Sequence, residues 1–189
     1  MRARIIGTGS CLPATIVTND DLSKIMDTSD EWISSRTGIR ERHLVKEETT
    51  AGMSAEAARR AMEDAGVTAE EIDLIIVGTL SADHVTPSCA CEVQAQIGAA
   101  NAVAFDINAA CAGFMFALNI ANAYLQTGVY KTALILGAET LSRIMDWNDR
   151  STCVLFGDGA GAAVVRAEEG TAGLLAFDQG SAGVKGGVL

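Results

Sequence analysis

A cysteine within a run of small residues is the side chain in this sequence best suited to covalent chemistry. Residues 105–114 read Phe-Asp-Ile-Asn-Ala-Ala-Cys-Ala-Gly-Phe, so Cys111 follows an apolar strand pattern and precedes a helical one. The positive end of a helix favours the thiolate, which is the nucleophilic form of cysteine, and free N–H groups there can face an oxyanion. This combination suits acyl transfer onto Cys111. The residues alone leave a buried structural cysteine as the slightly favoured alternative, because cysteine is often buried.

An aromatic and a cationic side chain form a second candidate site. Trp32 and Arg36 are four residues apart in a predicted helix, so they share a face. A flat indole beside a guanidinium can stack on a base or contact a phosphate. From the residues alone, a half-buried tryptophan with a surface arginine is the favoured alternative.

Three other features that could suggest chemistry predict structural roles. The glycine run 157–161 lacks a lysine, and a strand pattern follows it where a phosphate-binding loop needs a helix. Asp158 within it is therefore expected to be structural. His43 is predicted on a strand surface and His84 in a loop, and neither has the context of a catalytic base.

Composition excludes several classes of function. The 189-residue chain carries a net charge of -10, which argues against nucleic acid as its main partner. Its apolar stretches are too short to span a membrane, and its start lacks the features of a secretion signal, so a cytoplasmic location is expected. Cys89 and Cys91 are separated by one residue with no second Cys/His pair, so no metal site is expected.

The elements that would position these side chains follow a strand–helix rhythm. Apolar runs predict strands, and capped helical patterns lie between them; this order predicts an α/β domain with a largely parallel sheet and helices on both faces. Glycine-joined apolar runs after residue 151 predict antiparallel strands added to that sheet. The predicted strands are 3–9, 74–80, 103–107, 132–137, 152–156, 160–166 and 173–177, and the predicted helices are 19–26, 29–36, 54–64, 87–97 and 112–126.

Five motifs together carry a family resemblance. Residues 105–114 resemble the nucleophile motif of the β-ketoacyl-acyl-carrier-protein synthase III family. The other four motifs keep that family's order along the whole chain: Ile-Ile-Gly-Thr-Gly-Ser at 5–10, Asp-Thr-Ser-Asp-Glu-Trp-Ile at 27–33, Arg-Thr-Gly-Ile-Arg-Glu-Arg-His at 36–43 and Phe-Gly-Asp-Gly-Ala-Gly-Ala at 156–162. The resemblance implies the N-terminal half of a thiolase-like fold, with a mixed five-stranded sheet. Residues 1–178 are then the half-domain, and 179–189 are a glycine-rich connection to a C-terminal half.

The resemblance also implies a reaction. Members of this family move an acyl group from acyl-coenzyme A onto the cysteine, here Cys111. They then condense it with malonyl-acyl carrier protein, with loss of carbon dioxide, to initiate fatty acid synthesis. The implied protein is a homodimer that uses acyl-coenzyme A as a substrate and has no tightly bound cofactor.

Further site residues are carried over from the matching motif positions. The resemblance assigns coenzyme A binding to Thr28, Trp32, Arg36 and Arg150. Thr86 matches a position at the dimer interface whose side chain reaches the partner's acyl pocket. Because threonine is small where some relatives carry a bulky aromatic, we expect a roomier pocket that accepts longer or branched primers.

The match covers only half of such an enzyme. The motifs Pro-His-Gln-Ala-Asn and Gly-Asn-Thr-Ser, which hold the family's catalytic His and Asn, do not occur in these residues. The chain is therefore expected to be catalytically incomplete alone, as a fragment, as one of two separate chains, or as a polypeptide divided at a disordered segment. Two other functions stay open: a related thiolase-fold acyltransferase or long-chain condensing enzyme, and a non-catalytic half that only binds a partner.

Overall fold

The computed structural model describes residues 1–188 and contains one five-stranded mixed sheet, a two-stranded hairpin and helices on both faces of the sheet. The strands are β1 (Arg2–Cys11), β2 (Thr15–Thr18), β3 (Glu41–Leu44), β4 (Leu74–Gly78), β5 (Val103–Ile107), β6 (Thr132–Thr140) and β7 (Asp158–Glu168). The helices are α1 (Asn19–Leu22), α2 (Asp30–Thr37), α3 (Thr50–Ala65), α4 (Cys89–Ile97), α5 (Gly113–Gln126) and α6 (Arg150–Cys153), with 3₁₀ turns η1 (Ala69–Glu71), η2 (Ala110–Ala112), η3 (Leu141–Arg143) and η4 (Gly183–Val188).

The main sheet has the strand order β1-β7-β6-β4-β5. β4 pairs in parallel with β5 and β6, whereas β7 is antiparallel to both β6 and β1. Every residue of β4 is buried, as expected of a central strand covered on both faces. This confirms the predicted mixed five-stranded sheet of a thiolase-like α/β fold.

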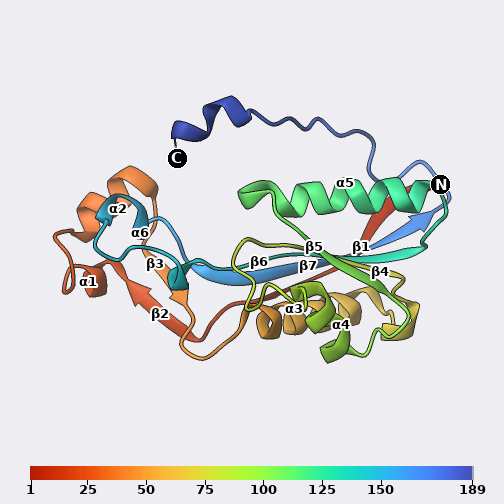
Figure 1. Cartoon of the computed structure of the whole chain (residues 1–189), viewed down its shortest axis with the longest axis horizontal. Coiled ribbons are helices and arrows are strands. Elements are labelled where there is room, and N and C mark those ends of the chain that lie inside the picture. Colours follow the sequence, from red (N-terminus) through yellow and green to blue (C-terminus); the bar gives the residue numbers. More distant parts are fainter. Residues whose placement is uncertain (189) are drawn as a thin grey trace.

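Helices cover the two faces of the sheet in separate layers (Figure 1). α3 and α4 lie on one face, where Ala57, Ala61 and Val93 join a fully buried core with alternate residues of β4, β6 and β7. α5 lies on the other face, where Ala117, Ala121 and Leu125 pack on the opposite set of strand residues. Successive side chains of each strand point to opposite faces of the sheet, so the strand residues are divided between two cores, one under each helical layer.

A small lobe stands beside the sheet at one end of the molecule (Figure 1). It consists of the β2–β3 hairpin with α1, α2 and α6, around a separate core of Leu22, Ile33, Cys153 and Val154. Thr18 caps α1 and Ser29 caps α2, and Gly38 ends α2 in the left-handed conformation, as the sequence predicts.

Two of the predicted strands are wrong. Residues 152–156 form the end of α6 and a turn, because Cys153 and Val154 are buried in the core of the lobe instead of pairing with a strand. Residues 173–177 run as irregular chain; Leu174 and Phe177 pack under α5, and the Leu174 N–H bonds the Ala3 carbonyl. β7 is thus the one antiparallel strand added to the sheet after residue 151 within the described residues.

No described helix is long and apolar enough to cross a bilayer. The glycine-rich segment 179–189 remains a predicted connection; Leu189 lies outside the described residues.

The α3 layer depends on glycines in β1 that allow the helix to pack at backbone distance. A Cβ atom on Gly9 would lie 2.3 Å from the Ala57 carbonyl oxygen and 2.5 Å from the Ala61 nitrogen. We therefore expect Gly9→Ala to lower the free energy of unfolding by about 1–3 kcal/mol, as overpacking typically does. Urea denaturation would measure the difference.

Gly161→Ala is the matched control. Gly161 lies on β7 directly opposite Ser10, the residue after Gly9, and a Cβ atom there would meet no atom within 4 Å. Equal destabilisation by the two substitutions would contradict the packing argument.

Candidate active site

Cys111 lies on a tight turn between strand and helix, as predicted. β5 ends at Ile107, the 3₁₀ turn η2 includes Cys111, and α5 begins at Gly113. The Cys111 side chain is exposed, whereas Cys89 and Cys153 are buried. The Gly113 N–H, the first of α5, already bonds the Ala110 carbonyl, and the Ala112 N–H bonds the Ala109 carbonyl.

Glycine contacts between backbones hold this turn against the sheet. A Cβ atom on Gly78, the last residue of β4, would lie 2.7 Å from the carbonyl carbon of Gly113. On β6, a Cβ atom on Gly137 would lie 3.3 Å from the Phe114 Cβ atom. The start of α5 therefore rests on the carboxyl ends of β4 and β6, and Cys111 is placed at that edge of the sheet.

Ala110, the residue before the cysteine, adopts φ +46°, and it is the one non-glycine residue with a positive φ in the described part of the chain. This left-handed conformation costs an L-residue roughly 1–2 kcal/mol. The Asn108 side chain accepts a hydrogen bond from the Ala110 N–H at 3.3 Å and so supports the turn. Local strain of this kind is often found at functional sites.

A cavity of about 220 Å³ adjoins the thiol. It is lined mainly by apolar groups, and Glu139 is the one carboxylate that lines it. Glu139 accepts hydrogen bonds from the Leu80 N–H at 3.0 Å and from the Ser81 hydroxyl, so its oxygens fix the loop after β4. The lining residues are Gly78, Leu80, Ala110, Cys111, Phe114, Gly137, Ala138, Glu139 and Leu141.

The loop that carries Thr86 is held from both sides. Asp83 accepts hydrogen bonds from the Thr50 and Ala51 N–H groups at the start of α3, and Arg143 donates to it at 2.8 Å. On the other side, His84 Nδ1 lies 2.8 Å from Glu92 Oε1 on α4. Thr86 is exposed between these two attachments. The sequence did not indicate these contacts, because the bonded residues are 8 to 60 positions apart.

The structure brings three of the predicted coenzyme A residues together in the lobe. The Arg36 guanidinium carbon lies 4.7 Å from the centre of the Trp32 ring, and that of Arg150 lies 4.9 Å from it. Arg150 also donates to the backbone carbonyl of Asp27. The helical spacing predicted the Arg36 contact, and the contact of Arg150, which comes from the distant α6, matches the family resemblance.

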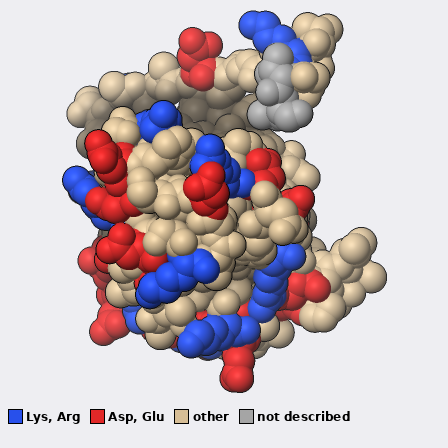
Figure 2. All heavy atoms as spheres, turned by 90° about the vertical axis from the view of Figure 1, so that its left-hand side faces the viewer, with Lys and Arg blue, Asp and Glu red and all other residues tan. Residues whose placement is uncertain are grey.

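Thr28 lies between Asp27, which holds Arg150, and Ser29, which caps α2. Its Oγ1 atom is buried and has no hydrogen-bond partner among the described residues. An unpaired buried hydroxyl is costly, so a ligand that reached this atom would supply a missing hydrogen bond. Figure 2 shows Lys and Arg side chains intermixed with Asp and Glu on this end of the molecule, so cations there act locally and do not form one broad basic surface.

The remaining polar candidates have structural partners. Asp158 is buried and accepts hydrogen bonds from the Val45 and Ser142 N–H groups at 2.8 and 2.9 Å. His43 Nδ1 lies 2.6 Å from the Pro13 carbonyl oxygen. Among residues 1–188, no three His, Cys, Asp or Glu side chains gather as a metal site requires.

The sequence did not point to Asp106. This aspartate on β5 accepts hydrogen bonds from the Cys89 and Ala90 N–H groups at 2.8 and 2.7 Å, and so caps α4. The sequence feature that could have indicated this role is the single carboxylate, Asp106, within an otherwise apolar strand. Burial, with a smaller contribution from Asp106, raises the pKa of the Cys89 thiol to about 12, so this cysteine stays protonated and unreactive.

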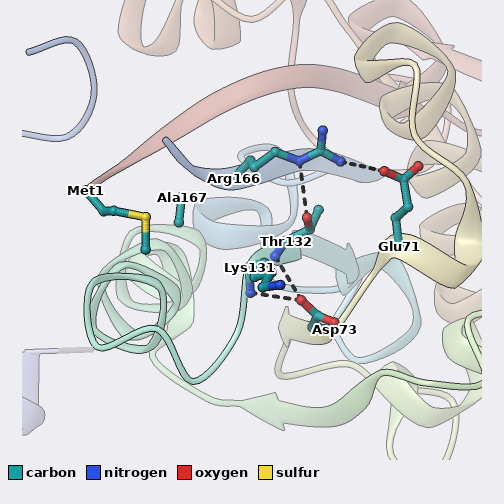
Figure 3. Close-up of a pocket in the computed structure, with 7 residues that line it drawn as sticks. All are labelled: Met1, Glu71, Asp73, Lys131, Thr132, Arg166 and Ala167. Atoms are coloured by element: carbon teal, nitrogen blue, oxygen red, sulfur yellow. Dashed lines mark hydrogen bonds and ion pairs between the residues drawn. The ribbon is translucent and has the colours of Figure 1, made fainter. Parts of the chain in front are cut away.

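A larger cavity of about 510 Å³ lies at the amino ends of β4 and β6, and Cys111 does not line it; Figure 3 shows the residues that do. Arg166 forms an ion pair with Glu71 and donates to Thr132, and Asp73 accepts from the backbone N–H groups of Lys131 and Thr132. These contacts close the amino ends of β4 and β6, so we interpret this cavity as structural.

Known proteins of one family are similar to this chain. The family model for 3-oxoacyl-[acyl-carrier-protein] synthase III matches residues 105–183, which include Cys111. A β-ketoacyl-[acyl-carrier-protein] synthase III from Clostridium acetobutylicum is 64% identical over 162 residues, which are 86% of this chain and 50% of that protein. One from Xanthomonas campestris is 59% identical over 170 residues, 89% of this chain and 52% of that protein. The chain thus spans about half the length of these curated relatives.

Solved structures give the same result. The synthase III of Aquifex aeolicus superposes with a TM-score of 0.88 at 55% identity, over 89% of this chain and 55% of that one. The synthase III of Pseudomonas aeruginosa gives 0.92 at 40% identity, over 98% and 57%.

A mixed sheet with a cysteine turn at the carboxyl edge of its parallel strands places the molecule among the thiolase-like α/β proteins. Within this class, the chain belongs to the β-ketoacyl-acyl-carrier-protein synthase III family and corresponds to the N-terminal half of its members.

Exposure predicts which cysteine reacts first. At about pH 8, limiting iodoacetamide should modify Cys111 before the other four, because its sulfur is exposed and a buried thiol reacts slowly. Peptide mapping by mass spectrometry would locate the adduct. Cys111→Ala should remove the first adduct and Cys91→Ala should not. Earlier modification of Cys11 or Cys91 would contradict this interpretation of the turn.

Proposed function

We propose that Cys111 accepts an acyl group from acyl-coenzyme A and passes it to malonyl-acyl carrier protein in a decarboxylative condensation that starts fatty acid synthesis. The main support is the exposed thiol at the start of α5, beside a cavity lined mainly by apolar groups. On this proposal the reaction is cytoplasmic, with acyl-coenzyme A as a substrate and no tightly bound cofactor.

In the first step, the Cys111 thiolate attacks the thioester carbonyl carbon of the acyl-coenzyme A. The negative oxygen that forms faces the backbone N–H of Cys111, which stabilises part of its charge. The carbon–sulfur bond to coenzyme A then breaks, coenzyme A leaves as a thiolate that takes up a proton, and the acyl group remains on Cys111 as a thioester.

In the second step, malonyl-acyl carrier protein loses carbon dioxide and becomes an enolate. The enolate carbon attacks the acyl carbon on Cys111, and the cysteine leaves as a thiolate. The described residues place no histidine beside Cys111, because His43 and His84 bond elsewhere. The family resemblance assigns the stabilisation of the enolate to a His and an Asn of the C-terminal half. The complete enzyme is therefore this half together with that one, in a homodimer.

The lobe would bind the nucleotide of coenzyme A. Trp32 offers a flat surface for adenine, and Arg36 and Arg150 offer cations that stack on a base or pair with phosphate. The buried Thr28 hydroxyl offers a further hydrogen bond. Arg150 contacts the indole ring, so it would have to move aside to admit a base.

Acylation of the thiol tests this function. Intact-mass spectrometry of the assembled protein, this chain with its C-terminal half, should show an acyl adduct after incubation with acetyl-coenzyme A. The adduct should disappear when malonyl-acyl carrier protein is added, as the β-ketoacyl product forms. Cys111→Ala should form no adduct.

Two outcomes would redirect the assignment. An acyl adduct that malonyl-acyl carrier protein does not consume would favour a related acyltransferase. No adduct with acetyl- or longer acyl-coenzyme A would favour a half that only binds a partner.

Primer selectivity tests the role proposed for Thr86. Thr86→Phe in the assembled dimer should lower kcat/KM for branched or longer acyl-coenzyme A by about tenfold or more relative to acetyl-coenzyme A, because an aromatic ring fills space in the pocket. Thr86→Ser, which keeps a small side chain, is the control. An unchanged ratio for the phenylalanine variant would remove Thr86 from the acyl pocket.

A further inference from the structure

Arg42 on β3 is a buried cation that no carboxylate neutralises within the described residues. It is only 5% exposed. Its guanidinium donates to the Val17 carbonyl at 3.2 Å, to Asn19 Oδ1 at 2.8 Å and to the Val154 carbonyl at 3.3 Å. Burial lowers the pKa of this arginine, as expected of a cation removed from water.

The hydrogen bonds of Arg42 continue through Asn19 to α2. Asn19 is 1% exposed, and its amide nitrogen donates to Asp30 Oδ1 and to the Ile39 carbonyl, both at 2.8 Å. Asp30 is the first residue of α2 and Ile39 follows its last turn. The pair Arg42–Asn19 therefore fixes both ends of this helix.

Both sides of the proposed nucleotide site depend on this network. Trp32 lies on α2, two residues after Asp30. Arg150 begins α6, and Val154, which accepts from Arg42, is the residue that ends it. Arg42 thus joins, through hydrogen bonds alone, the helix that carries the indole and the helix that carries the opposing guanidinium.

An arginine suits this role better than a lysine. The planar guanidinium carries five donors in a fixed geometry and can bond acceptors on three segments at once, whereas an ammonium is a point charge on a flexible stem. Hydrophobic side chains of similar volume would fill the same space at lower cost in desolvation. The retention of a costly buried charge is therefore explained by the need to fix the directions of the segments that it joins.

We propose that Arg42 is a positioning residue which, with Asn19 and Asp30, sets the distance between Trp32 and Arg150 and thereby the affinity for the nucleotide of acyl-coenzyme A. This inference rests on the proposed function for its ligand. The arrangement of the indole can also be tested without any ligand.

Tryptophan fluorescence tests the arrangement directly. In a Trp147→Phe background Trp32 is the single tryptophan, and Arg42→Lys should make acrylamide quench it more strongly, because the indole loses its fixed place against Arg150. Arg40→Lys is the matched control. Arg40 is exposed, and its side chain bonds Asp30 Oδ2, whereas Asn19 bonds Asp30 Oδ1. Equal quenching in all three proteins would overturn the inference, whatever the protein binds.

Steady-state kinetics of the assembled enzyme provide the second test. Arg42→Lys should raise KM for acetyl-coenzyme A about tenfold, the size expected for losing one hydrogen bond to a charged group. The value of kcat and the rate of Cys111 alkylation should stay unchanged. An unchanged KM in a folded Arg42→Lys variant would overturn the specific role.

Asp30→Ala covers the case in which Arg42→Lys does not fold. Asp30→Ala removes the carboxylate that accepts from Asn19 and should also raise KM for acetyl-coenzyme A. Arg40→Ala removes only the Arg40–Asp30 ion pair and should leave this KM unchanged. Equal KM values for these two variants would refute the role of the network. If Trp32→Ala leaves KM unchanged while the fluorescence result holds, the nucleotide assignment fails and the positioning of Trp32 by Arg42 stands.

Discussion

Direct contact between the backbones of helices and strands is the constraint on which this structure depends. On one face of the sheet, Gly9 allows α3 to lie against β1; on the other, Gly78 meets Gly113 at the start of α5. No side chain separates the two layers at these points, so a helix cannot shift without moving the strand beneath it. The position of the Cys111 sulfur is consequently determined by the sheet and not by flexible side-chain contacts.

The two parts of the proposed site are held by different physical means. The cysteine turn is fixed by close steric packing of small residues on the sheet. The lobe has a small apolar core, and a buried network of hydrogen bonds around Arg42 and Asn19 fixes the positions of its helices relative to one another. Hydrogen bonds specify direction more strictly than apolar contacts do, which suits short helices that hold an indole between two guanidiniums.

Much of this arrangement follows from local sequence patterns. Strand β4, helix α5, the caps of α1 and α2 and the contact of Trp32 with Arg36 were all predictable, because each depends on neighbours within a few residues. The segment 152–156 was not, because its apolar residues fill the core of the lobe and a short apolar run does not reveal which core it joins. The acceptors of Arg42 lie 23 to 112 residues away, so its network depends on the tertiary fold.

Ala110 shows how a strained residue can support a catalytic geometry. Glycine would adopt φ +46° without strain, but it would also leave the turn free to sample other conformations. A methyl group at Ala110 disfavours a positive φ, so this conformation persists only because the surrounding contacts hold it. The strain at Ala110 is therefore offset by the contacts that hold the start of α5 on the sheet, so the direction of the thiol is set when the chain folds.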